Sequence, residues 1–236
     1  MASVRELWRY PVKSLRGERV EETLLSEEGL AGDRLVRPQS LTGRRMSARQ
    51  HPGLLGLSGT TGPDGTPLVN GHPWWSDAAE ALVREASAAD IRLVEDRSRI
   101  RFDVLPVSLV TDGALARLGI DLRRLRPNIV VEGVDGLAER DWQGTSLRVG
   151  EAVVGVRQVR GRCVMTTFDP DTLEQDLGVL RRIVDDFDGR FALDCYVLEP
   201  GRIAVGDPFE VLGPWTLSDD AARRQLGGMV RPASAA

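Results

Sequence analysis

Short strand-like segments separated by glycine and proline turns recur along this chain, and they constrain its fold more than any other feature. Apolar and polar residues alternate in these segments, or form brief apolar runs, as in half-buried and buried β-strands. The cluster Gly62-Pro63-Asp64-Gly65 lies between two of them and predicts a hairpin. The expected strands are residues 3–8, 18–25, 54–57, 67–69, 91–94, 105–110, 129–131, 145–149, 152–159, 192–198 and 203–212, with another beginning at 34–36.

Helical patterns occur at four places only. Ser76 is suited to cap a helix over 77–87, and Thr111 or Asp112 to cap a helix over 113–118 that Gly119 ends. A third helix is expected to begin at 169–172, and a fourth covers 218–226 before a frayed tail. The apolar face of the third helix consists of Leu177, Leu180, Ile183, Val184 and Phe187. Strands interrupted by so few helices predict an α+β, β-rich fold with a barrel-like sheet rather than alternating βαβ units.

The length of 236 residues suits one large domain or two closely joined ones. We place a boundary near residue 97, which gives an N-terminal β-rich domain over 1–96 and a second domain over 97–214. Residues 215–236 then form a C-terminal helix and tail.

Charge and residue counts exclude several classes of partner and site. The net charge of −4 gives no global positive field for nucleic acid, and no apolar run reaches the roughly 18 residues of a membrane span. The N-terminus lacks a signal-peptide pattern, so we expect a cytoplasmic protein. With only Cys163, Cys195, His51 and His72, the chain cannot form a four-cysteine zinc or iron–sulfur site. Any redox centre must therefore be a bound cofactor with few protein ligands.

Common nucleotide and hydrolase motifs are also missing. Of the 31 basic residues only Lys13 is a lysine, and no glycine-rich stretch precedes it, so a phosphate-binding P-loop is excluded. No GxGxxG or GxSxG string occurs. The sequence thus gives no support to P-loop, dinucleotide-binding or α/β-hydrolase chemistry.

Cys163 is the cysteine best placed for chemistry. Arg160 and Arg162 lie beside it in the sequence, and nearby guanidinium groups favour the thiolate, which is the form that binds metals and acts as a nucleophile. The alternative is a small apolar side chain in a strand. Cys195 has no adjacent cation and is expected to be part of the core.

Lys13 and Ser14 form a candidate anion-binding pair. In a chain that otherwise uses arginine, a lone lysine offers a compact ammonium that can donate to phosphate, and Ser14 adds a hydroxyl. Survival of one lysine by chance is the alternative. Arg34, Arg49 and Arg126 flank predicted strands, as ligand-facing residues or as surface ion-pair partners.

Several motifs together resemble the MOSC-domain proteins, the family of the mitochondrial amidoxime-reducing component and its bacterial relatives. These motifs are Tyr10-Pro11-Val12-Lys13-Ser14, Gly32-Asp33-Arg34, Ser47-Ala48-Arg49-Gln50, Arg126-Pro127-Asn128-Ile129, the stretch from Arg162 to Thr172 and Ile203-Ala204-Val205-Gly206-Asp207. They follow the family's order across about residues 4–212. The resemblance implies a MOSC-type β-barrel with peripheral helices, preceded by a smaller N-terminal β-rich subdomain.

The resemblance also implies a molybdenum cofactor, Mo-molybdopterin, and an activity independent of pyridoxal phosphate. Cys163 matches the cysteine that binds the molybdenum. Other positions match cofactor-binding residues, with Lys13, Ser14 and Arg34 on the pterin phosphate; the full set is Lys13, Ser14, Arg34, Ser47, Thr111, Arg126, Asn128 and Cys163. Gly161 departs from the family, because the amidoxime-reducing proteins carry serine at that position.

The implied function is a reductase that removes oxygen from small N-hydroxylated substrates: amidoximes, hydroxylamines and N-hydroxylated bases. Asp169 is a candidate proton donor, or else a cap for the helix that follows it. Because the chain lacks cysteines for a cluster, electrons would come from a separate flavoprotein or ferredoxin-like protein. The alternative is a carrier that transfers sulfur or cofactor through Cys163. Neither membrane nor nucleic acid is an expected partner.

Overall fold

The computed structural model describes residues 1–227. Sixteen strands and four α-helices lie in this part of the chain. The strands are β1 (Ser3–Arg9), β2 (Glu18–Val20), β3 (Glu22–Ser26), β4 (Gly29–Leu30), β5 (Val36–Ser40), β6 (Gly59–Thr61), β7 (Pro67–Val69), β8 (His72–Pro73), β9 (Ile91–Glu95), β10 (Val107–Thr111), β11 (Ile129–Glu132), β12 (Thr145–Val149), β13 (Ala152–Gly161), β14 (Arg190–Glu199), β15 (Gly201–Ala204) and β16 (Phe209–Pro214). The helices are α1 (Asp77–Ser87), α2 (Asp112–Leu118), α3 (Leu177–Phe187) and α4 (Asp219–Gln225).

The largest sheet closes into a barrel. Its eight strands run in the order β16-β12-β13-β14-β10-β11-β1-β2, in which β10 and β11 form a parallel pair. The start of β1 then meets the start of β16, because the Val4 amide donates to the Asp207 carbonyl at 2.9 Å and the Phe209 amide to the Ala2 carbonyl at 3.1 Å. This closure leaves fewer unpaired edge groups than an open sheet would. The predicted α+β, β-rich barrel fold is confirmed.

Alternating apolar residues of the strands fill the barrel. Leu7, Ile129, Leu193 and Cys195 have no exposed surface and belong to one buried cluster with side chains from β10 to β16. Period-two alternation brings one face of each strand to this core, as the sequence pattern indicates. Burial also raises the pKa of the Cys195 thiol, which is therefore a packing residue, as expected.

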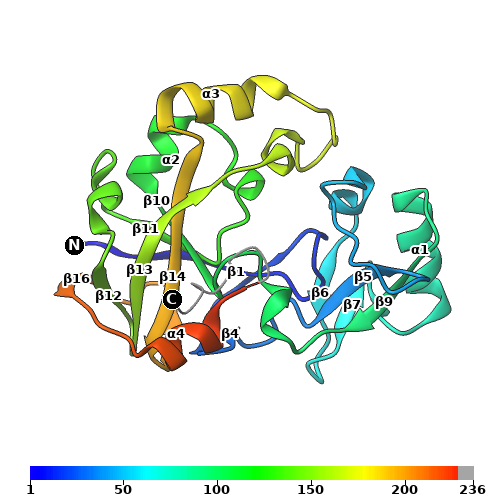
Figure 1. Ribbon diagram of the computed structural model, residues 1–236, viewed down its shortest axis with the longest axis horizontal. Coiled ribbons are helices and arrows are strands. Elements are labelled where there is room, and N and C mark those ends of the chain that lie inside the picture. The colour runs from blue at the N-terminus through cyan, green and yellow to red at the C-terminus, as the bar shows by residue number, and fades with distance from the viewer. Residues whose placement is uncertain (228–236) are drawn as a thin grey trace, which may run out of the picture.

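Helices α2 and α3 cover the outside of the barrel (Figure 1), where their apolar faces bury Val110, Val130 and Phe191 between helix and sheet. The predicted cap of α2 is confirmed: the Thr111 hydroxyl accepts from the Ala114 amide, and Gly119 ends the helix in the left-handed conformation. None of the helices in residues 1–227 combines the length and apolar character that a bilayer-spanning helix needs.

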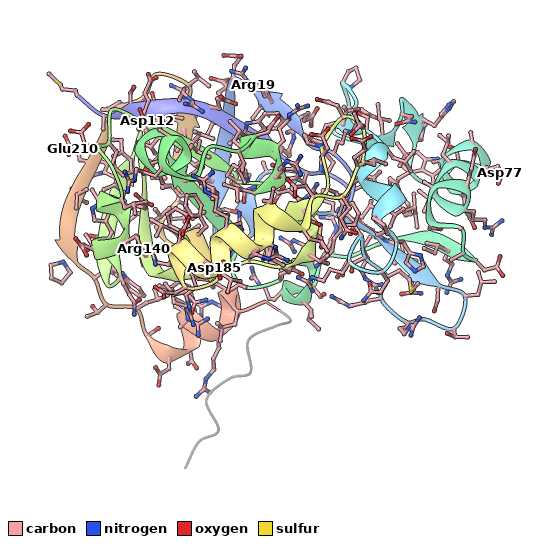
Figure 2. All side chains as sticks on the ribbon, turned by 90° about the horizontal axis from the view of Figure 1, so that it is seen from above. Arg19, Asp77, Asp112, Arg140, Asp185 and Glu210 are labelled. Atoms are coloured by element: carbon pink, nitrogen blue, oxygen red, sulfur yellow. The ribbon has the colours of Figure 1, made fainter. Side chains whose placement is uncertain are left out.

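A second body of small sheets is formed by residues 36–95. The pair β5-β9, the sheet β6-β7-β8 and α1 enclose their own buried cluster, and Ser76 caps α1 as predicted. Figure 2 shows Asp77 on α1 and Glu210 on β16 at opposite ends of the molecule. Strands β1 and β2, although N-terminal, belong to the barrel sheet. The domain boundary near residue 97 stays a prediction.

The expected strand at 54–57 is wrong. Residues Pro52–Gly56 form a short 3-10 helix, in which the Leu54 amide donates to the His51 carbonyl and the Leu57 amide to the Leu54 carbonyl. Leu54 and the adjacent Leu55 are both buried, which alternation in a strand with one exposed face does not give. Proline at the start of the turn fixes a helical φ angle and favours this conformation.

The third helix begins later than predicted. Oδ1 of Asp169 accepts from the amides of Asp171 and Thr172 at 2.9 and 3.0 Å, which closes a turn, and Leu173 is left-handed with φ 62°. The chain therefore leaves the helical direction, and α3 starts only after its cap, Asp176. Two long expected strands are also divided, 18–25 into β2 and β3, and 203–212 into β15 and β16. The predicted tail beyond residue 227 lies outside the described residues.

Candidate functional site

A cavity of about 660 Å³ lies where the N-terminal segment meets the barrel. Eight arginines and one lysine line it, against two aspartates, so its wall is strongly cationic. The lining residues are Lys13, Ser14, Arg34, Ser47, Arg49, Asp103, Val104, Arg124, Leu125, Arg126, Arg157, Gln158, Arg160, Gly161, Arg162, Cys163, Met165, Thr166, Asp188, Gly189 and Arg190.

Cys163 is a free, half-buried thiol in this wall. It follows the end of β13 and precedes the 3-10 turn Val164–Thr167, in which the Thr166 amide and hydroxyl both donate to the Cys163 carbonyl, at 3.1 and 2.9 Å. The turn fixes the backbone of the cysteine. Burial alone would lower the pKa of Arg49 in the same wall, but Asp103 and Cys163 outweigh it and raise that pKa.

Two ion pairs in the same wall share one carboxylate, because Asp103 pairs with both Lys13 and Arg49. The Lys13 ammonium donates to the Arg101 carbonyl at 2.7 Å and to Oδ1 of Asp103 at 2.9 Å, and Arg49 donates to Oδ2 of Asp103 at 3.0 Å. Burial lowers the pKa of Lys13, against the attraction of Asp103. Burial also opposes ionisation of Asp103, but Lys13 and Arg49 prevail and hold the pKa of Asp103 below its ordinary value. The carboxylate of Asp103 is thus stable in its ionised form between the two cations.

Ser14, Arg34 and Ser47 also reach the cavity. Ser14 and Arg34 are left-handed, with φ 74° and 54°, and these turns bring two neighbouring loops together. The Ser14 hydroxyl accepts from the Ala48 amide at 3.0 Å, and Arg34 pairs with buried Asp33. The Ser47 hydroxyl donates to the Gln50 side chain at 2.7 Å.

Tyr10 supports two of the cavity arginines from behind. Its ring lies under the guanidinium carbons of Arg34 and Arg126, 4.9 and 4.3 Å from the ring centroid, and its hydroxyl donates to the Pro127 carbonyl at 3.1 Å. Burial raises the pKa of Tyr10 to about 12, despite these cations. Burial likewise lowers the pKa of Arg126 to about 10. Tyr10 therefore stays neutral near pH 7, and its ring packs against two guanidinium groups.

The end of β13 contributes further arginines. Arg160 donates to Oδ1 of fully buried Asp194 at 2.6 Å, and Arg162 donates to the Leu125 carbonyl at 2.8 Å. Burial, followed by the charge of Arg160, lowers the pKa of Arg162 to about 9. These groups lie next to Cys163 and add positive charge around its thiol.

Three predicted site residues lie outside the cavity lining. Thr111 has no exposed surface, and its hydroxyl caps α2 and bonds Glu139 at 3.1 Å. Asn128 is buried and bonds the Ser108 amide, the Trp8 carbonyl and Asp33, so it joins strands rather than closing a local turn. Asp169 lines a smaller neighbouring cavity of about 160 Å³.

The fold brings the remaining predicted residues together in the cavity wall. They are Lys13, Ser14, Arg34, Ser47, Arg126 and Cys163. The predicted site set omits other residues of the cavity wall: Arg49, Asp103, Arg124, Arg157, Gln158, Arg160, Arg162 and Arg190. Arg49 lies in one of the motifs above, and Arg160 and Arg162 flank Cys163, so proximity to those motifs could have identified them. No neighbouring motif in the sequence marks Asp103 or Arg190 as a residue of the site.

Comparison with protein families identifies both parts of the chain. Residues 1–94 match the MOSC N-terminal beta barrel domain, and residues 108–210 match the MOSC domain. Among curated proteins, human mitochondrial amidoxime-reducing component 1 is 27% identical over 284 aligned residues, covering 90% of this chain and 84% of that protein. Human mitochondrial amidoxime reducing component 2 is 25% identical, covering 88% of this chain and 83% of that protein.

Among solved structures, the YUAD protein from Bacillus subtilis matches with a TM-score of 0.46 at 14% identity, covering 92% of this chain and 98% of that one. YiiM from Escherichia coli matches with a TM-score of 0.43 at 13% identity, covering 98% and 88%. From the family matches, which follow one another in the expected order, the chain is a MOSC-domain protein in which a MOSC N-terminal beta barrel domain precedes the MOSC domain.

Proposed function

We propose that this protein is a molybdenum-dependent reductase of N-hydroxylated compounds and that Cys163 binds the metal of a molybdopterin cofactor. The observation that carries the proposal is a thiol in a cavity wall with eight arginines and one lysine. The likeness to amidoxime-reducing components over about 90% of the chain supports the reaction class. Amidoximes, hydroxylamines and N-hydroxylated bases are the proposed substrates.

The residues present fit such a cofactor. A thiolate is the form of cysteine that binds metals, and the guanidinium groups of the cavity wall place positive charge around Cys163. Among residues 1–227, buried Nη1 of Arg157 and Nε of Arg162 have no hydrogen-bond partner, so the wall retains donors for an anionic ligand. The Lys13 ammonium, Ser14 hydroxyl and Arg34 guanidinium are suited to a phosphate.

When bound, the cofactor supplies the two-electron chemistry that removes oxygen from the substrate. Cys163 acts as its protein ligand, with its backbone held by the turn that follows. Lys13, Ser14 and Arg34 hold the phosphate, and Arg126 on the Tyr10 ring adds a cation to the wall. Thr111 and Asn128 would act through the structure that they hold together, rather than by contact. We also propose a small-molecule substrate, a separate flavoprotein or ferredoxin-like electron donor, and a cytoplasmic location.

Asp169 suits a positioning role better than proton donation. Backbone amides of Thr172 and Asp171 bond its carboxylate and lower its pKa, so it is ionised near neutral pH. It accepts from Arg124 at 2.9 Å, and Arg124 also donates to the Thr167 carbonyl at 2.9 Å. Asp169 therefore orients an arginine of the cavity wall.

Metal and pterin analysis tests the proposal. The chain is co-expressed with a cofactor pathway, and molybdenum is measured by mass spectrometry beside the fluorescence of the oxidised pterin. Turnover of an amidoxime and a hydroxylamine is followed with an artificial electron donor. We expect near-stoichiometric molybdenum and turnover in the wild type, loss of both in Cys163→Ala, and retention of both in the matched control Cys195→Ala.

The competing function, a carrier of sulfur or cofactor through Cys163, gives a different result. A carrier releases pterin readily and shows no steady-state reduction. Stoichiometric molybdenum and normal turnover in Cys163→Ala would overturn the role of this thiol in either function.

A further inference from the structure

Strand β13 departs from regular alternation where it approaches the cavity. Val154 and Val156 belong to the barrel core, but the next side chain of this strand against that core is Val159. The pairing with β14 shifts between Val156 and Gln158, where β13 advances by two residues and β14 by one, so Arg157 is the extra residue of a β-bulge in β13. It shifts again between Val159 and Gly161, where the extra residue belongs to β14 and Ala192 is left-handed. Bulges re-aim side chains, and Arg157 and Arg160, which lie at these two irregularities, both line the cavity.

The two bulges help to assemble a group of four guanidinium side chains in the wall beside Cys163: Arg157, Arg160, Arg162 and Arg190, here termed the Arg157 cluster. Within residues 1–227 only Arg160 of this cluster forms an ion pair, with Asp194. Gln158 also donates to Asp194, at 3.3 Å, so both oxygens of this buried carboxylate already accept a hydrogen bond. Of the two acids that line the cavity, Asp103 pairs with Lys13 and Arg49. The other, Asp188, pairs with Arg140 at 3.5 Å and has a highly exposed side chain.

Three cations of the cluster therefore lack an acidic partner among the described residues. Nη1 of Arg157 and Nε of Arg162 are buried without any acceptor, and Arg190 makes only a 3.5 Å contact to the Val159 carbonyl from its side chain. An unpaired buried donor is costly unless a ligand provides its acceptor. The two unpaired donors lie among guanidinium groups that have no acidic partner in the described part of the chain, and together they indicate a site for an oxyanion.

One cofactor phosphate does not account for these cations. In the proposed function the phosphate is held by Lys13, Ser14 and Arg34, which come from the N-terminal segment. The Arg157 cluster comes instead from β13, β14 and the residue after β13, and Arg162 is the direct neighbour of Cys163. The cavity thus offers a second group of donors on the barrel side.

We propose that the Arg157 cluster is a second anion subsite of the cavity and that it selects substrates carrying a carboxylate or phosphate in addition to the N-hydroxy group. This substrate class rests on the proposed reductase function, whereas anion binding by the cluster does not. Paired guanidinium donors suit both oxyanions because they present parallel N–H groups to two oxygens.

Binding to the cofactor-free protein provides the first test. Benzoate, phenyl phosphate and neutral benzamide are titrated by calorimetry into a Lys13→Gln background, which weakens the other anion site. We expect both anions to bind more tightly than benzamide, with binding that weakens as salt is raised. Arg157→Gln and Arg190→Gln should each weaken anion binding about tenfold, the scale of a lost charged hydrogen bond. Arg157→Lys, which keeps the charge, should lose less.

Arg181→Gln on α3 is the matched control, because Arg181 is exposed and does not line the cavity. It removes the same global charge and should leave anion binding unchanged. Circular dichroism establishes that each variant is folded. Benzamide binding as tightly as benzoate, or unchanged anion affinity in folded Arg157→Gln and Arg190→Gln, would overturn the subsite. A stronger effect for phenyl phosphate than for benzoate would assign it to phosphate, and the reverse to carboxylate.

Kinetics of the cofactor-loaded enzyme provide the second test. The ratio of kcat/KM for a para-carboxylated aromatic amidoxime to that for the unsubstituted amidoxime should fall about tenfold in Arg157→Gln, on the same basis, and stay constant in Arg181→Gln. A ratio unaffected by Arg157→Gln in an enzyme that turns over both compounds overturns the selectivity but leaves the reductase intact. Absence of molybdenum and turnover refutes the reductase, and the calorimetry then still decides whether the anion subsite exists.

Discussion

The ammonium of Lys13 lies 2.9 Å from a carboxylate oxygen of Asp103, and this carboxylate is the acid that holds the single lysine of the chain in the cavity wall. The second oxygen of the same carboxylate pairs with Arg49, which lines the cavity together with Cys163. One acid thus links the proposed phosphate end of the cavity to the proposed metal ligand.

Asp103→Asn should lower the free energy of unfolding of the cofactor-free protein by about 2 kcal/mol at pH 7, because it leaves Lys13 and Arg49 without their shared counter-ion. The folded pKa of Asp103 is depressed, so its contribution is present above the unfolded pKa of about 4 and is lost as the pH falls from there towards the folded value. Urea unfolding at pH 7 and at pH 3 measures this difference.

The matched control for that experiment is Asp188→Asn. Asp188 is exposed and lies in a left-handed position that asparagine tolerates, and its only ion pair within residues 1–227 is with Arg140 at 3.5 Å. Its effect should stay within about 0.5 kcal/mol. Equal stability of Asp103→Asn and wild type at pH 7 would show that the ion pair contributes nothing net.

Tyr10→Phe and Tyr10→Leu should separate the two roles of this residue. Phenylalanine keeps the ring under Arg34 and Arg126 and removes only the bond to the Pro127 carbonyl, at a cost of about 1 kcal/mol. Leucine also removes the aromatic face and should cost about 3 kcal/mol in total. Thermal and urea unfolding measure both values. Similar losses in the two variants would mean that cation–ring contact is unimportant here.

Gly161→Ser restores the residue type that the resemblance associates with this position. A Cβ at Gly161 meets no atom within 4 Å, and its φ angle is not in the left-handed region, so the stability should change by less than about 0.5 kcal/mol. Gly161 lines the cavity two residues before Cys163, so the substitution adds a hydroxyl to the cavity wall. A loss of more than about 1 kcal/mol in unfolding experiments would contradict the open space at this position.

Gly53→Ala should be poorly tolerated, in contrast to Gly161→Ser. A Cβ at Gly53 would lie 2.0 Å from the Ala86 carbonyl oxygen, in the last turns of α1. Because both partners are backbone, relief requires the helix to move, at a cost of about 2 kcal/mol. Urea unfolding gives the measurement, and a stability equal to that of the wild type would show that α1 can shift without loss.

Local sequence information predicts much of the architecture. Alternating strands, the caps Ser76 and Thr111, and the β-rich α+β class follow from side-chain periodicity and from hydrogen bonds between near neighbours. The motif residues Lys13, Ser14, Arg34, Arg126 and Cys163 are also evident, because each lies in a short recognisable stretch. Where the local signal misleads, as at 54–57 and 169–172, proline or an aspartate turn competes with the regular element.

Only the tertiary structure decides which of these residues share a wall. Asp103 joins Lys13 to Arg49 across 90 and 54 positions of sequence, and Asp194 reaches Arg160 through pairing of β13 with β14. A bulge in β13 places Arg157 in the cavity wall against the period of the strand. Sequence periodicity reports the face of an element and cannot report strand register or contacts between distant segments. The gathering of cationic side chains in the cavity wall therefore follows from strand pairing and chain closure, which depend on the whole fold.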